Sequence, residues 1–219
     1  IFLKVFNLIK SKNNILKDMA TKNSSFDNDT LEKETDKKSS SQKGRGQNGK
    51  ESLKKIFEEL LQDTYSAETQ IVQALPEMVK AAHSEELQDA FETHLTQTKK
   101  QVERLEKIFN RLRIEKKSEK CKAMEGLVEE GQKIIKEHTD NVTRDVALII
   151  AAQKVEHYEI AAYGSLVELA DVLGLDKVAD ILETTLQEEK ETDDLLSEIA
   201  QQVNDEAFEY NSEEYSFQN

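Results

Sequence analysis

Two glutamates interrupt an apolar run in the segment AAQKVEHYEIAAYG, residues 151–164. Ala152 and Ala162 recur there at the spacing of a helix that faces other helices, and Glu156 and Glu159 lie inside the same stretch. A carboxylate in a dry helical core costs several kcal/mol unless a cation or hydrogen bonds compensate its charge. The chemistry that this pair of residues suggests is therefore the binding of a metal cation.

Four long segments carry an apolar helical stripe, and polar residues interrupt each stripe near its middle. We predict helices from Ser52 to about 82, from after Ser84 to about 113, over about 142–173, and over about 176–203. Besides Glu156 and Glu159, the interrupting residues are Thr64 and Glu68; His94, Gln97, Thr98 and Gln101; and Glu188, Glu189 and Asp193. Because the interruptions share one level, they would meet inside a bundle.

The connections between these segments predict the topology. The first and second helices are separated by a few residues, as are the third and fourth, so each pair should form an antiparallel hairpin. The third helix should end at Gly174, and Asp176 should cap the fourth. The long link between the hairpins contains AMEGLVEEGQKIIKEH, which has a short helical pattern of its own. The fold predicted is an all-α four-helix bundle, with two hairpins joined by a crossover that carries an extra helix.

Composition limits the classes of ligand. The chain has 219 residues with one proline, and its formal net charge is −14. Such a charge argues against binding to nucleic acid or to an anionic membrane, which needs clustered Lys and Arg, and it favours a cation. The single cysteine, Cys121, cannot form an internal disulfide, which fits a reducing compartment and a cytoplasmic protein.

The two ends of the chain are polar and should lie outside the bundle, which we place at residues 51–205. Residues 1–50 are expected to form a disordered polar arm, and residues 206–219 a polar tail. Residues 1–18 lack the roughly 20 apolar residues of a membrane span and the pattern of a signal peptide. Since Met19 opens a more ordinary start, we interpret residues 1–18 as upstream sequence or a misassigned start, with an amphipathic targeting helix as the alternative.

Several motifs in order carry a family resemblance. From about Leu53 to Asp193 the chain resembles the YciE/YciF family of ferritin-like proteins, through DTYSAETQIVQALPEMVKAA, FETHLTQTKKQVERLEKIF, CKAMEGLVEEG, RDVALIIAAQKVEHYEIAAYGSLVELADVLG and LETTLQEEKETD. The resemblance implies a ferritin-like bundle in a bacterial, stress-associated cytosolic protein.

The resemblance also implies a ligand set. Ferritin-like di-iron proteins use a Glu from each of two helices and a Glu-x-x-His from each of the other two. Glu156-x-x-Glu159 resembles the third-helix pair of rubrerythrin-like members, but the second helix has His94-x-x-Gln97 and the fourth has no histidine. In the fourth helix we prefer Glu189 to Glu188 as the inward residue. The candidate ligands for iron or another divalent metal are thus Glu68, His94, Gln97, Glu156, Glu159 and Glu189.

Each candidate also has a structural interpretation. Glu68, Glu156 and Glu159 could belong to a hydrogen-bonded network with Thr64, Gln97, Gln101 or Tyr163, and His94 could bond to Glu156 or Glu68. His157 is expected in packing or an interface. Two functions therefore remain open: a stress-response protein whose metal site has a redox or sequestering role, and a metal-free helical scaffold. A homodimer is expected in either case, and the sequence does not decide whether the protein is an enzyme.

Overall fold

Five helices make up the part of the chain that the computed structural model describes, residues 39–117 and 119–216, with side chains for 48–117 and 119–209. These ranges contain no β-strand, which confirms the all-α prediction. The helices are α2 (Ser39–Ala81), α3 (Glu85–Leu112), α4 (Lys122–Glu137), α5 (Asn141–Leu173) and α6 (Asp176–Ser216). The bundle belongs to the unit Gln47–Asn219.

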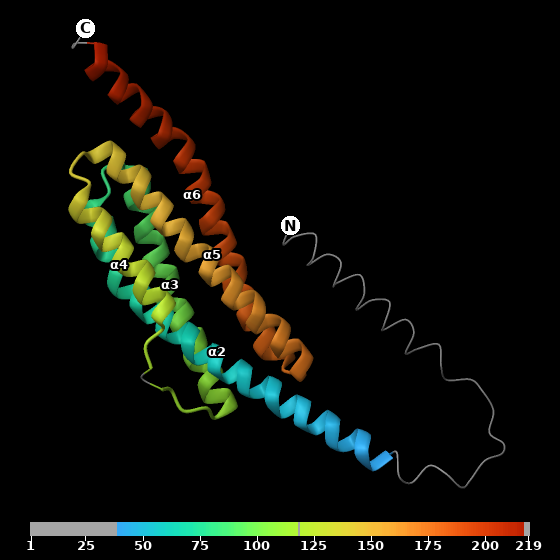
Figure 1. The fold of residues 1–219 in the computed structure, drawn as a ribbon. Helices are drawn as coiled ribbons and strands as arrows, with labels where there is room; N and C mark the ends of the chain where they lie inside the picture. The colour runs from blue at the N-terminus through green and yellow to red at the C-terminus, as the bar shows by residue number, and fades with distance from the viewer. Residues whose placement is uncertain (1–38, 118, 217–219) are drawn as a thin grey trace, which may run out of the picture. The chain divides into compact units, whose positions relative to one another are not determined.

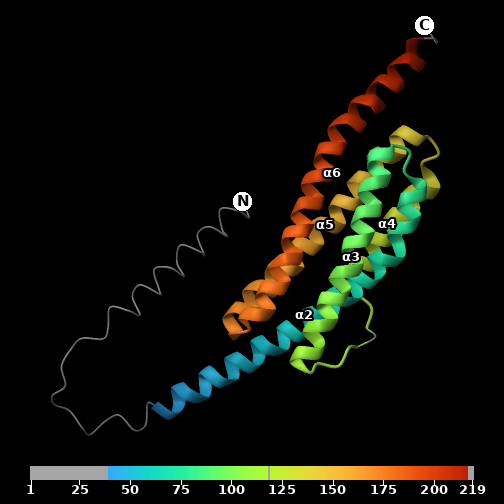
Figure 2. The same cartoon turned by 180° about the vertical axis from the view of Figure 1, so that it is seen from behind.

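The predicted topology of two hairpins and a crossover is confirmed. Short turns at 82–84 and 174–175 join α2 to α3 and α5 to α6, and the link between the hairpins contains α4 (Figure 1). Helix α5 packs against α6, α3 packs against α6, and α4 packs against α5 (Figure 2). None of the helices in the described ranges has a segment long and apolar enough to cross a membrane.

The helix ends follow local sequence signals in most places. The Ser84 side chain caps α3 by accepting from the Leu87 backbone N–H, as its type predicts. Gly174 ends α5 with a φ of 74°, a left-handed conformation that glycine adopts at little cost. Asp176, which we predicted as a cap, is instead the first residue of α6.

The outer ends of α2 and α6 correct the sequence prediction. Helix α2 begins at Ser39 rather than at Ser52, whose hydroxyl donates to the Asn48 carbonyl inside the helix. Helix α6 continues to Ser216, beyond the end predicted near residue 203. Extending an existing helix adds one hydrogen bond per ordered residue, whereas nucleation is the costly step, so polar flanks can prolong a packed helix. Most of the predicted arm, residues 1–38, lies outside the described residues.

Two apolar clusters fill the bundle, one on each side of a polar layer. The first contains Ile71, Leu87, Phe91, Leu148 and Leu196, and the helix α4 packs against it. The second contains Phe57, Leu61, Leu105, Leu166 and Leu182. Along every one of α2, α3, α5 and α6 the polar residues come between the two clusters. The predicted common level of the interruptions is therefore confirmed.

Candidate metal centre

The polar layer consists of buried side chains from four helices. Helix α2 supplies Thr64 and Glu68, α3 supplies His94, Thr98 and Gln101, α5 supplies Glu156 and Glu159, and α6 supplies Thr185, Glu189 and Thr192. Since the apolar clusters close the layer on both sides, its charged groups are removed from water.

Four of these residues converge on one point. His94, Glu156, Glu159 and Glu189 each offer one ligand atom, and the four atoms all lie within 4.8 Å of one another. None of the four residues is more than 3% exposed. The Nε2 atom of His94 lies 3.3 Å from Oε1 of Glu156, so the sequence-based expectation of a contact between them is confirmed.

Glu68 lies beside this group and has a partner of its own. The Tyr163 hydroxyl donates to Oε1 of Glu68, one of the pairings expected from the sequence, while Oε2 has no hydrogen-bond partner among the described residues. Burial raises the pKa of Glu159, and the charge of Glu68 adds to this effect. Glu68 thus borders the four-residue group without belonging to it.

Apart from the hydrogen bond from Tyr163 to Glu68 and a contact between the carboxyl groups of Glu156 and Glu189, the carboxyl groups of the layer lack the hydrogen bonds that a structural network would give them. Within the described residues, both oxygens of Glu159 and both of Glu189 are buried without a hydrogen-bond partner, as are Oε2 of Glu156 and both ring nitrogens of His94. Buried polar atoms in folded proteins nearly always have a partner, and a bound ion can take the place of hydrogen bonds. The orphaned atoms therefore fit a cation better than a closed polar network.

The neighbouring hydroxyl groups do not supply the missing donors. Thr64 donates to the Leu60 carbonyl and Thr98 to the His94 carbonyl, each four residues back in its own helix. Thr192 likewise donates to the backbone carbonyl of Glu188. Each threonine hydroxyl donates its hydrogen bond within its own helix, so these hydroxyl groups are buried with a partner. They are therefore not donors to the carboxyl groups.

Burial shifts the titration of every candidate ligand toward the uncharged form. It raises the pKa of Glu68, Glu156 and Glu159 well above the ordinary value, and neighbouring carboxylates reinforce the effect. It raises the pKa of Glu189 to about 8 and lowers the pKa of His94 to about 4. At neutral pH His94 is therefore a neutral imidazole, the form that binds metals.

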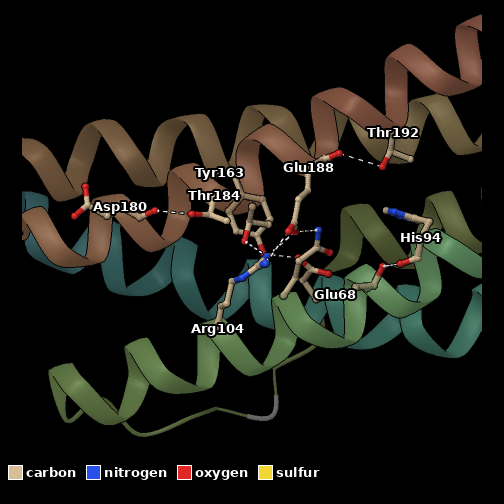
Figure 3. Close-up of polar contacts among 11 residues, drawn as sticks. Glu68, His94, Arg104, Tyr163, Asp180, Thr184, Glu188 and Thr192 are labelled. Carbon is tan, nitrogen blue, oxygen red and sulfur yellow. Dashed lines mark hydrogen bonds and ion pairs between the residues drawn. The ribbon is translucent and has the colours of Figure 1, made fainter.

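An arginine and a fifth glutamate border the layer on one side. The Arg104 guanidinium donates two hydrogen bonds to the Glu188 carboxylate in a bidentate pair, 2.5 Å from Nη1 to Oε2 and 2.6 Å from Nη2 to Oε1. The Gln101 side-chain amide also donates to Oε2 of Glu188, at 3.1 Å. Figure 3 shows Arg104 reaching from α3 toward Glu188 on α6. Burial alone would raise the pKa of Glu188, but the hydrogen bonds with Arg104 and Gln101 and the positive charges of Arg104 and Lys100 together outweigh burial and lower the pKa. Glu188 is thus a paired carboxylate, unlike Glu189.

The orientation of α3 and α6 decides which predicted residues enter the layer. Glu189 is fully buried, which confirms the preference for it over Glu188. Gln97, predicted as a ligand, is only half-buried, whereas Gln101 on the same helix is buried. The buried stripe of α3 instead passes through His94, Thr98 and Gln101, at steps of four and three residues.

Two residues expected to be unimportant for the metal lie away from it. His157 is 71% exposed and its Nε2 lies 3.2 Å from Oδ2 of Asp193, on the outside of the bundle. Cys121 caps α4, and its Sγ lies 3.3 Å from Oδ2 of Asp63 and 3.2 Å from the Tyr158 hydroxyl. Burial raises the pKa of the Cys121 thiol, so it remains protonated at neutral pH and is chemically inert.

The pKa shifts predict how the stability of the metal-free protein depends on pH. A carboxyl group whose pKa is raised from about 4.5 in the unfolded chain to about 8 in the fold stabilises the fold below 4.5, and this contribution is lost as pH rises to 8. His94 acts in the opposite direction, but its contribution changes only below 6.5. We therefore expect the free energy of unfolding to fall between pH 6.5 and 8, measured by urea denaturation in a chelator.

A matched variant provides the control for this pH dependence. Glu189→Gln keeps the size of the side chain and removes its titration. The free energy of unfolding of this variant should therefore fall less between pH 6.5 and 8 than that of the wild type. Glu183→Gln, on the exposed side of α6, should leave the decline unchanged. A wild-type stability that rises over this interval would contradict the assigned protonation of the layer.

Comparisons with known proteins cover the same part of the chain. A family model described as Domain of unknown function (DUF892) matches residues 52–209. Protein YciF of Escherichia coli (strain K12) is 46% identical over 151 residues, which are 68% of this chain and 91% of YciF. The crystal structure described as that of the E. coli stress protein YciF matches with a TM-score of 0.68 and 45% identity, over 70% of this chain and 97% of that chain. A structure of YcfI from Rhodopseudomonas palustris matches with a TM-score of 0.64 and 38% identity, over 66% of this chain and 92% of the other.

Proposed function

This chain belongs to the family described as Domain of unknown function (DUF892), and we propose that its bundle binds a divalent metal ion through His94, Glu156, Glu159 and Glu189. The observation that carries the proposal is the convergence of these four buried residues with most of their ligand atoms unpartnered. A bound cation would neutralise charges that the described surroundings leave uncompensated.

The spacing of the ligand atoms and their chemical types fit a single metal ion. Ligand atoms on opposite sides of an ion are separated by about twice the metal–ligand distance, roughly 4.0–4.4 Å for nitrogen and oxygen donors. The observed limit of 4.8 Å is close to that separation. Imidazole and carboxylate donors suit iron, manganese and zinc, whereas a copper(I) or iron–sulfur site would need thiolates. We take iron as the first candidate and another divalent metal as the second.

The residues around the group have separate tasks in this proposal. Tyr163 holds one oxygen of Glu68 by a hydrogen bond, which leaves the other oxygen free to face the site. Arg104 engages Glu188 and so keeps that carboxylate out of the ligand set. The two apolar clusters exclude water from the layer. Bound iron would supply redox chemistry, and a redox-inert ion would supply only neutralisation and stability.

We propose a role in a stress response, with iron sequestration or redox chemistry as the activity. The relative with the crystal structure is described as a stress protein, and that description supports the role for this chain. The single cysteine is a buried free thiol, which suits the cytoplasm that we propose as its location.

Metal content is the first experiment. Protein purified from iron-replete cells should carry close to one metal ion per chain, measured by plasma mass spectrometry. The double variant Glu156→Ala/Glu159→Ala removes two of four ligands and should carry less than about a tenth of that amount, because each lost ligand weakens binding by at least an order of magnitude. A double variant of exposed acidic residues, Glu129→Ala/Glu183→Ala, should retain the wild-type content.

A metal-free scaffold that forms homodimers is the second candidate function. Large apolar side chains on the outside favour it, since Val172 is 67% exposed and Phe208 is 78% exposed. This candidate predicts a metal content near zero in the wild type, unchanged by Glu156→Ala/Glu159→Ala. The same experiment therefore separates the two functions.

A further inference from the structure

A mainly apolar cavity lies under the crossover helix α4 and reaches the proposed metal centre. Its volume is about 50 Å³. Every helix from α2 to α6 contributes to its walls, and His94 and Glu156 form part of them. Most of the remaining lining is aliphatic or aromatic and includes Ile71, Leu75, Phe91, Leu127, Val155 and Leu196. His94 and Glu156 thus border an apolar space, although little of either side chain is accessible.

Small residues create this space. Ala90, Ala151 and Ala152 line it from α3 and α5, where larger side chains would fill it. Gly131 lines it from α4 and is buried, yet a Cβ atom added to Gly131 would have no heavy atom within 4 Å. A mid-helix glycine costs about 0.5–1 kcal/mol relative to alanine, so its presence here is a local loss of stability. Because Gly131 is buried and lines the cavity, its missing side chain accounts for part of this space.

We propose that this cavity binds a small uncharged apolar molecule, of the size of dioxygen, against the His94 and Glu156 edge of the metal centre. The proposal deepens the proposed function, because the metal is what such a molecule would meet. A water molecule needs roughly 10–15 Å³ of such space and two to four polar partners. The cavity is larger than that, but apolar side chains outnumber the polar ones on its walls, which besides His94 and Glu156 are Thr192 and the exposed residues Glu77 and Gln132. A charged ligand would lose its hydration without compensation.

Xenon is the probe of this site, because it is uncharged and enters apolar cavities. Metal-free wild-type protein should bind xenon, observed by the xenon NMR chemical shift and by a peak under α4 in crystals under xenon pressure. Gly131→Leu places a side chain in the gap and should lower xenon binding at least tenfold. Gly126→Leu is the matched control, because Gly126 lies on the same helix and does not line the cavity.

Gly131→Ala keeps the test decisive if the leucine variant folds poorly. It adds one carbon where no atom lies within 4 Å and favours the helix, so it should fold like the wild type and reduce xenon binding. Absence of xenon from the wild-type protein, or equal binding by the wild type and both Gly131 variants, would overturn the proposal.

A separate measurement tests whether the cavity lies next to the metal. After loading with Mn²⁺, xenon in the wild-type protein should relax at least tenfold faster than in the metal-free protein, because the paramagnetic ion lies beside the His94 wall. Unchanged relaxation in a protein that has bound Mn²⁺ would overturn the proposed contact with the metal. Xenon binding by a protein that takes up no metal would support the cavity and contradict the proposed function alone.

Discussion

Replacing Glu159 and Glu189 together by leucine is expected to raise the free energy of unfolding of the metal-free protein by about 1–4 kcal/mol. All four carboxyl oxygens of these two residues are buried without a hydrogen-bond partner among the described residues. Leucine has a similar size and extends the apolar clusters into the layer, where Glu68, His94 and Glu156 remain. Urea denaturation in the presence of a chelator at pH 7 measures the change.

The matched control for this gain is Glu183→Leu, which lies on the exposed side of the same helix as Glu189. Surface substitutions of this kind change stability by less than about 0.5 kcal/mol. A loss of more than about 1 kcal/mol in the double leucine variant would mean that Glu159 and Glu189 stabilise the metal-free fold through polar contacts. In that case the layer is a structural network and our account of it is wrong.

Metal should stabilise the wild-type protein and leave the double leucine variant unaffected. At a free metal concentration one hundred times the dissociation constant, binding to the folded state alone raises the free energy of unfolding by about 2.7 kcal/mol. For a domain of this size that corresponds to roughly 5–10 °C in the melting temperature. Scanning calorimetry with Mn²⁺ or anaerobic Fe²⁺ measures the shift at pH 7.5, where protons compete less for the carboxyl groups than at lower pH.

The contrast between the two proteins makes this prediction specific. The leucine variant should be more stable than the wild type without metal, and the metal should narrow or reverse that difference. Equal stabilisation of both proteins would show that the ion binds elsewhere, for example at exposed acidic residues. Glu183→Leu should respond to metal like the wild type.

The fold followed from signals that lie close together in the sequence. Ser84 and Gly174 mark helix ends through their own side chain or backbone conformation, and the short turns they stand in require antiparallel hairpins. The outer ends of α2 and α6 could not be predicted in this way. Helix α2 begins in polar residues before its apolar stripe starts, and α6 continues through polar residues after its stripe has ended. No proline in either polar flank marks a helix end.

The level of the candidate site was predictable, but its membership was not. Apolar stripes that lose their pattern at one height indicate a polar layer, and Glu68, Glu156 and Glu159 all lie in it. Which residues of α3 enter the layer depends on the rotation of that helix, so Gln97 was chosen where Gln101 is the buried amide. Gln97 was chosen because it lies three residues from His94, the spacing of the Glu-x-x-His motif from which this pair departs, whereas the buried stripe continues in steps of four and three.

Arg104 carried no sequence signal of its role. It follows Glu103 in a run of charged residues, and its pairing with Glu188 joins two helices that are far apart in the chain. Long-range ion pairs depend on the relative axial position of two packed helices, which a single sequence does not specify. Once that position is known, the pair explains why adjacent glutamates on α6 have opposite pKa shifts.

The central claim is that one metal ion binds among His94, Glu156, Glu159 and Glu189, and anomalous diffraction tests it most directly. Crystals of protein loaded with Mn²⁺ or Fe²⁺ should give a single strong anomalous peak in the polar layer, within coordination distance of these four residues. Crystals of Glu156→Ala/Glu159→Ala prepared in the same way should lack that peak. An empty layer in the wild-type crystals, with anomalous peaks only at exposed carboxylates, would contradict the account.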